Sequence, residues 1–236
     1  MTLTLSPKKV LRLLLVVIFM LFIANAASLT SRHGLGHRFD IGGGIFSLFN
    51  FDTESNIPSF YSALALVLAC VLLGTIAAAQ KKLAAPYLPW ATLSVIFAFL
   101  SIDEIAALHE RLIGTVRNIL GAQGLFYFAW IIPYSIGLII LGIVYIRFLR
   151  ALPKRTAILF VCSGSIFVLG AIGFEMLGGM RAEVHGTTGF IFALLYTAEE
   201  SLEMLGIALF IYSLLEFIGE EHGRIEVSIA SSKPHP

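Results

Sequence analysis

The chain has 236 residues, of which 58% are hydrophobic and 13% are charged, and its mean hydropathy is +0.89. This composition excludes an ordinary soluble domain and predicts a protein that crosses a membrane several times. The formal net charge of +1 gives no reason to expect nucleic acid as a partner, and Cys70 and Cys162 form no CxxC pair and predict no disulfide framework.

Six apolar runs are each close to the ~20 residues that a helix needs to cross the hydrocarbon core. We therefore expect an all-α membrane protein with six transmembrane helices in a single domain, 1–236. The third run continues as a helix to about Leu120. The first run also has the basic start and small residues of a signal peptide, so a cleaved leader and a retained helix both stay open. The predicted spans are 10–29, 61–80, 88–106, 125–148, 156–177 and 188–217, with an outer loop at 30–59 and a polar tail at 218–236.

Basic residues near the span ends predict the orientation. If both termini are cytoplasmic, nine lysines and arginines fall near the inner ends of the spans and five near the outer ends, as the positive-inside rule requires. The nine are Lys8, Lys9, Arg12, Lys81, Lys82, Arg147, Arg150, Lys154 and Arg155.

Three carboxylates, Glu199, Glu200 and Glu203, lie within the last apolar run. An ionised carboxylate in the middle of a bilayer costs at least ~2.5–3.5 kcal/mol, so these groups must be protonated, paired, hydrated or bound to a cation. Their i,i+3 and i,i+4 spacing puts all three on one broad helix face. Tyr196, one turn before Glu200, is placed to donate a hydrogen bond to it.

Two other spans carry ionisable side chains near their outer ends. The third span leads into Asp103, Glu104, His109 and Glu110, and the fifth carries Glu175. Because these ends face the same side, we expect the groups to line one cavity in the outer half of the membrane. At 100° per residue, His109 points about 120–140° away from Asp103 and Glu104. One straight helix cannot aim all of them at one ion, so either a helix break or two separate roles is required.

Three interpretations of these groups stay open. In the first they bind a metal, since mixed carboxylate and imidazole ligands suit Fe, Mn or Zn. In the second, crowded carboxylates share protons, as in a proton- or cation-coupled transporter. In the third they pair with Arg111, Arg181 or His185 and only hold the bundle together. The candidate metal ligands are Glu200, Glu203, Glu175, Asp103, Glu104 and His109, with Glu199, Glu110 and Tyr196 as further polar groups.

The outer loop holds a second candidate cation site. Asp52, Glu54 and Asn56 alternate along the chain, and oxygen side chains in such a pattern suit calcium, although it takes six to eight oxygen ligands. The same residues also suit a polar turn and a helix cap. His33 and His37, earlier in the loop, are either solvated or folded over the cavity.

The pattern Ser-Ile-Asp-Glu-x4-His-Glu at 101–110 and the pattern Glu-Glu-x-x-Glu-Met-Leu-Gly at 199–206 resemble a family of bacterial multi-pass membrane proteins with no assigned activity. The resemblance covers most of the chain and implies the inner membrane of a bacterium.

A bound metal would act on a lipid-like substrate that enters sideways from the bilayer. The alternatives are a transporter and an accessory subunit of a larger membrane complex.

Overall fold

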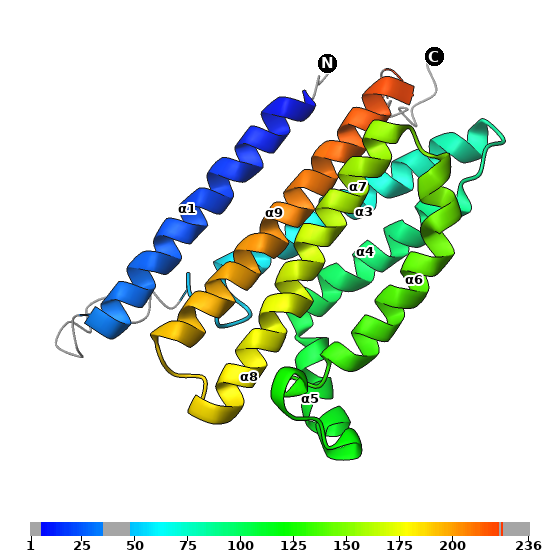
Figure 1. Cartoon of the computed structure of the whole chain (residues 1–236). Coiled ribbons are helices and arrows are strands. Elements are labelled where there is room, and N and C mark those ends of the chain that lie inside the picture. Colours follow the sequence, from blue (N-terminus) through cyan, green and yellow to red (C-terminus); the bar gives the residue numbers. More distant parts are fainter. Residues whose placement is uncertain (1–5, 35–47, 222, 224–236) are drawn as a thin grey trace, which may run out of the picture.

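The computed structural model is all-helical over the residues that it describes, which are 6–34, 48–221 and 223 (Figure 1). Six helical stretches in these ranges are long and apolar enough to cross a membrane, as the sequence predicts. The elements are α1 (Pro7–Gly34), α3 (Ile57–Lys82), α4 (Leu88–Ala106), α5 (Leu108–Leu120), η2 (Gly124–Phe126), α6 (Ile131–Ala151), α7 (Lys154–Val168), η3 (Leu169–Phe174), α8 (Glu175–His185) and α9 (Phe190–Glu221).

The crossings alternate in direction, so α1 begins and α9 ends at the same end of the bundle (Figure 1). We call this the basic end, because α3 ends there at Lys82, α6 ends there beside Arg150, and α7 begins there at Lys154. The positive-inside rule predicts that this end faces the cytoplasm. We call the opposite end, where α4 ends and α6 and α9 begin, the carboxylate end.

Two helix boundaries differ most from those that the sequence suggests. The fourth crossing begins at Ile131 instead of Leu125, because Gly124–Phe126 forms a separate 3-10 turn. The fifth crossing continues to His185, beyond the expected end at Leu177. It passes through Gly178 and Gly179 without ending because these glycines make room for a neighbour: a Cβ on Gly179 would lie 3.2 Å from the ring of Phe128.

The fifth crossing contains a π-helical turn, η3, between α7 and α8. Such turns inside α-helices are frequent at functional sites, because the extra residue changes the direction in which the following side chains point. Gly170 lies in this turn, and a Cβ on it would be 2.7 Å from the carbonyl oxygen of Glu199 on α9. The missing side chain therefore lets the two backbones touch beside Glu175, the first residue of α8.

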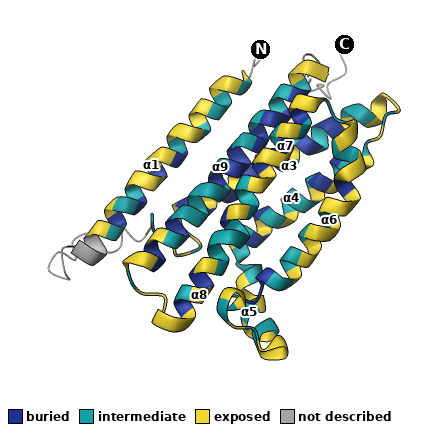
Figure 2. Ribbon diagram, in the orientation of Figure 1, coloured by how far each residue is buried: buried dark blue, intermediate teal, exposed yellow. Residues whose placement is uncertain are grey.

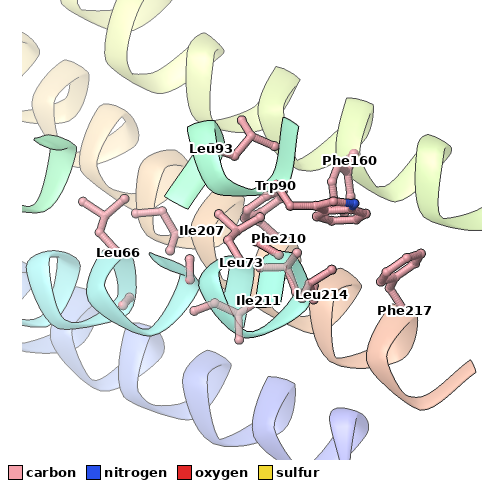
Figure 3. Close-up of a cluster of buried hydrophobic side chains, with 14 of the residues drawn as sticks. Leu66, Leu73, Trp90, Leu93, Phe160, Ile207, Phe210, Ile211, Leu214 and Phe217 are labelled. Carbon is pink, nitrogen blue, oxygen red and sulfur yellow. The ribbon is translucent and has the colours of Figure 1, made fainter. Parts of the chain in front are cut away.

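The larger of two buried apolar clusters lies nearer the basic end and is built around α9 and α3, whereas α6 turns mostly exposed side chains outward (Figure 2). Leu73, Ile211 and Leu214 have no exposed surface. Trp90 packs edge-on against Phe160 (Figure 3), with ring centroids 5.9 Å apart. It packs in the same way against Phe148, with ring centroids 5.0 Å apart, and so joins α4, α6 and α7. This packing leaves the ionisable groups of the crossings to gather at the carboxylate end.

Candidate functional site

The helix that carries the run from Asp103 to Glu110 breaks after Ala106. Ala107 has left-handed backbone angles, φ 50° and ψ 45°, which are uncommon for a residue with a Cβ. Oδ1 of Asp103 accepts the backbone N–H of His109 at 2.8 Å, and so satisfies one of the free N–H groups at the start of α5. A helix break, one of the two alternatives that the spacing of Asp103 and His109 leaves open, is therefore present, and it turns the imidazole back toward Asp103.

His109 lies between two carboxylates. Its Nδ1 is 3.3 Å from Oδ1 of Asp103, and its Nε2 is 3.5 Å from Oε1 of Glu54. Burial alone would lower the pKa of His109, but the hydrogen bond and charge of Asp103, with the charges of Glu54 and Glu110, raise it above its usual value. Glu54, His109 and Glu110 each offer one ligand atom, and these atoms all lie within 4.8 Å of one another.

Glu54 reaches this group from the outer loop. Burial raises the pKa of Glu54 to about 7, although the nearby His109 acts to lower it. Its Oε1 faces His109, and its Oε2 is buried and has no hydrogen-bond partner among the residues that the structure describes. The sequence places Glu54 in a separate calcium site, whereas in the fold it belongs to the group around His109.

The loop that carries Glu54 is fixed to α1 and α9. Oδ1 of Asn25 accepts the N–H of Phe51 at 3.1 Å, and its Nδ2 donates to Oγ1 of Thr197 at 2.9 Å. The hydroxyl of Tyr196, which the sequence suggests as a donor to Glu200, donates to Oδ1 of Asn50 at 3.2 Å. Because Asn25 and Asn50 have no exposed surface, this network holds the loop in one position.

The other two members of the proposed calcium loop have different surroundings. Oδ1 of Asn56 caps α3 by accepting the N–H of Ser59 at 3.0 Å, and its Nδ2 donates to the carbonyl oxygen of Asn50 at 2.6 Å. Asp52 is exposed. The cap was one of the two interpretations of this loop, and calcium binding stays a prediction. The side chain of His33 and the whole of His37 lie outside the described residues.

Five further carboxyl groups gather deeper in the bundle, from three crossings. Glu104 interacts electrostatically with Glu200 and with Glu54. Glu203 interacts in the same way with Glu200, Glu104 and Glu175. Glu199 neighbours Glu175 closely enough for their carboxyl groups to share a hydrogen bond. The chain therefore brings its predicted site residues to one region, although not around a single point.

None of these five groups forms an ion pair with a lysine or arginine in the part of the chain that the structure describes. The ion pairs found there join His109 to Glu54 and Asp103, and Arg155 to Glu216 and Glu220. The interpretation in which Arg111, Arg181 or His185 pairs with the buried carboxylates is therefore wrong for these residues. Protons, water or a bound cation must therefore offset the crowded charge.

Two aromatic residues at the start of the fourth crossing support the site, and the sequence analysis missed both. Nε1–H of Trp130 donates to Oε1 of Glu175 at 3.0 Å, and the hydroxyl of Tyr134 donates to Oδ2 of Asp103 at 3.0 Å. The Trp130 ring also packs on the His109 ring, with centroids 4.8 Å apart. The available signal was an aromatic cluster at an outer span end, a pattern that equally indicates an ordinary interfacial belt.

A search of curated proteins and a search of solved structures found no match to the chain. A family model does match, over residues 10–217, and this stretch includes all six crossings except the ends of the first and last. The two sequence patterns suggest a family with no assigned activity, and the matching family also has none. The chain belongs to the family described as a domain of unknown function, DUF8692.

Proposed function

We propose that the protein is a membrane metalloprotein whose metal ion is held by Glu54, His109 and Glu110 at the carboxylate end. The observation that carries the proposal is the meeting of two carboxylates and one imidazole with ligand atoms within 4.8 Å of one another. Carboxylate and imidazole together suit Zn, Mn or Fe. The buried and unpartnered Oε2 of Glu54 supports the proposal further, because a cation would supply the partner that this oxygen lacks.

Asp103 has the position of an orienting carboxylate in this proposal. Histidines that bind metals usually present their second ring nitrogen to a carboxylate or carbonyl group, which fixes the ring and makes the ligating nitrogen more basic. Asp103 lies at Nδ1 of His109, at 3.3 Å, and so leaves Nε2 on the side of Glu54. Among the six ligands that the sequence suggests, His109 keeps that role and Asp103 takes a supporting one.

The deeper carboxylates have a separate role in this proposal, as a store of protons beside the metal. A metal held there would make a nearby water more acidic, and a carboxyl group within reach would take up the proton. Two carboxyl groups hydrogen-bond to each other only with a proton between them, so the Glu175–Glu199 pair suits a proton store. Its position deep among the crossings favours a substrate that approaches through the bilayer, and so a lipid-like molecule.

A proton- or cation-coupled transporter is the second candidate, and the same unpaired carboxylates favour it. A transporter requires a polar path that continues to the basic end. The buried side chains toward that end are mostly apolar, and Leu73, Ile211 and Leu214 have no exposed surface. The metalloprotein therefore accounts for more of the site, and an accessory subunit has no specific observation in its favour.

The test is the metal content of protein purified in mild detergent without chelators, measured by elemental mass spectrometry. We expect close to one equivalent of Zn, Mn or Fe in the wild type, and a large loss in Glu54→Gln and in His109→Gln. Glu221→Gln, a change of the same kind at an exposed position, is the control and should retain the metal. Equal metal content in all four proteins, or none in the wild type after metal is added, would contradict the proposal.

A further inference from the structure

A hollow of about 490 Å³ lies at the basic end, between the end of α6 and the start of α7. Arg150 and Lys154 line it near the turn that joins the two helices. Ile158, Val161 and Cys162 continue its wall along α7. It is far from the carboxylate end and has no part in the function proposed above.

The two cations of the hollow are available to a ligand. Within the described residues neither Arg150 nor Lys154 belongs to an ion pair, and both are exposed. Their neighbour Arg155 differs, because its guanidinium lies 2.7 Å from Glu216 and 3.1 Å from Glu220 and so faces α9. The charge on the hollow side is therefore positive and uncompensated by the protein.

The hollow is a shallow groove that is longer than a headgroup. Lys154 and Cys162 are eight residues apart on one helix, which corresponds to about 12 Å along its axis. Its wall along α7 is apolar, and Ile158 and Val161 expose 50% and 53% of their surfaces. A free phosphate ion would occupy only the charged part, whereas a phospholipid has both an anionic head and an apolar chain of this reach.

We propose that this hollow binds an anionic phospholipid, with its phosphate at Arg150 and Lys154 and an acyl chain along Ile158 and Val161. Basic pockets between transmembrane helices on the cytoplasmic side suit such headgroups. Few Cα atoms of α6 and α7 lie close to one another, and the lipid would occupy the hollow between the two helices. It thereby supports α6, the helix that carries Tyr134.

The test is native mass spectrometry of delipidated protein titrated with phosphatidylglycerol or with phosphatidylcholine. Each cation near an anionic headgroup contributes roughly a factor of five, so phosphatidylglycerol should bind about 30-fold more tightly. The double variant Arg150→Gln/Lys154→Gln should lose this preference. Lys81→Gln/Lys82→Gln, which removes two charges at the same end of the bundle, should keep it. Equal binding of the two lipids by the wild type, or an unchanged preference in the first variant, would overturn the proposal.

A second pair of measurements separates the lipid from a free anion. Val161→Trp fills the apolar part and leaves the charge unchanged, and it should weaken phosphatidylglycerol binding at least tenfold. Inorganic phosphate, at the same concentration as the lipid, should not displace it. Full displacement by phosphate, together with normal binding by Val161→Trp, would show that the hollow holds only a free anion and would overturn the lipid assignment.

Discussion

Oδ1 of Asp103 is shared between two groups of His109, because it accepts the backbone N–H at 2.8 Å and lies 3.3 Å from Nδ1 of the ring. The same carboxylate therefore starts α5 and sets the direction of the imidazole. This arrangement links the helix break to the candidate metal ligand. Substitutions at Asp103 can therefore test two effects, the capping of α5 and the orientation of the His109 ring.

Asp103→Asn should weaken metal binding with little loss of structure. Asparagine keeps an oxygen that can cap α5, but its amide lacks the charge that makes the ring nitrogen of His109 more basic. Loss of such an orienting carboxylate typically lowers metal affinity by about 10- to 100-fold. Asp103→Ala should, in addition, lower the free energy of unfolding by roughly 1 kcal/mol through the lost cap. Metal titration and thermal unfolding of the two variants measure the two effects, and equal metal affinity in the wild type and Asp103→Asn would contradict the orienting role.

Metal binding should weaken as the pH falls. Burial raises the pKa of Glu54 to about 7, and the charges of Asp103, Glu54 and Glu110 raise the pKa of His109 despite its burial. Both groups therefore take up protons as the pH falls through neutrality, and a protonated group cannot bind the metal. We expect the affinity to fall about tenfold or more from about pH 8 to about pH 6. Calorimetric titration across this range provides the check, and a flat profile would exclude both residues as ligands.

Trp130→Phe tests whether α6 supports the carboxylates. Phenylalanine keeps a ring against His109 but removes the N–H that donates to Glu175 at 3.0 Å. Because a buried carboxyl group then loses its donor, we expect the free energy of unfolding to fall by about 1–3 kcal/mol. Tyr145→Phe is the control, because it also removes one hydrogen bond of an aromatic side chain, the bond to Pro89 at 2.9 Å, far from the site. Both variants should lose stability on thermal unfolding, and an unchanged stability of Trp130→Phe would contradict the support from α6.

Gly206→Ala should destabilise the bundle. A Cβ at this position would lie 2.8 Å from the backbone nitrogen of Phe167, where α9 meets α7, and neither backbone can move without disturbing its neighbours. Overpacking of this kind costs about 1–3 kcal/mol. Gly164→Ala is the matched control on α7, because its Cβ would meet nothing within 4 Å. Thermal unfolding in detergent should separate the two variants, and equal melting temperatures would show that the helices are less closely packed at Gly206.

The predictable part of the fold follows from local composition. The apolar runs required helices of membrane-spanning length, and the spacing of Asp103 and His109 required either a break in the helix or two roles for it. The carboxylates of the third, fifth and sixth crossings converge because helices of alternating direction bring those ends together. The first two inferences need only the chain near the residues concerned, and the third needs only the number and direction of the crossings.

The role of Glu54 could not be predicted in the same way. Its position depends on Asn25, which bonds both the loop backbone and Thr197, 172 residues away in the chain. Trp130 and Glu175 are likewise 45 residues apart. The π-helical turn at η3 also has no pattern of its own, since it arises where Gly170 permits contact with α9. These features come from tertiary packing and not from local sequence.

The most direct test of the account is a titration of Zn²⁺, Mn²⁺ and Fe²⁺ into chelator-treated protein, with wild type and Glu54→Gln compared by calorimetry. Glutamine keeps the size of the side chain and removes the negative oxygen that faces His109. We predict one equivalent of metal bound to the wild type and an affinity at least tenfold lower in the variant. Identical binding curves for the two proteins would contradict the assignment of Glu54, His109 and Glu110 as a metal site.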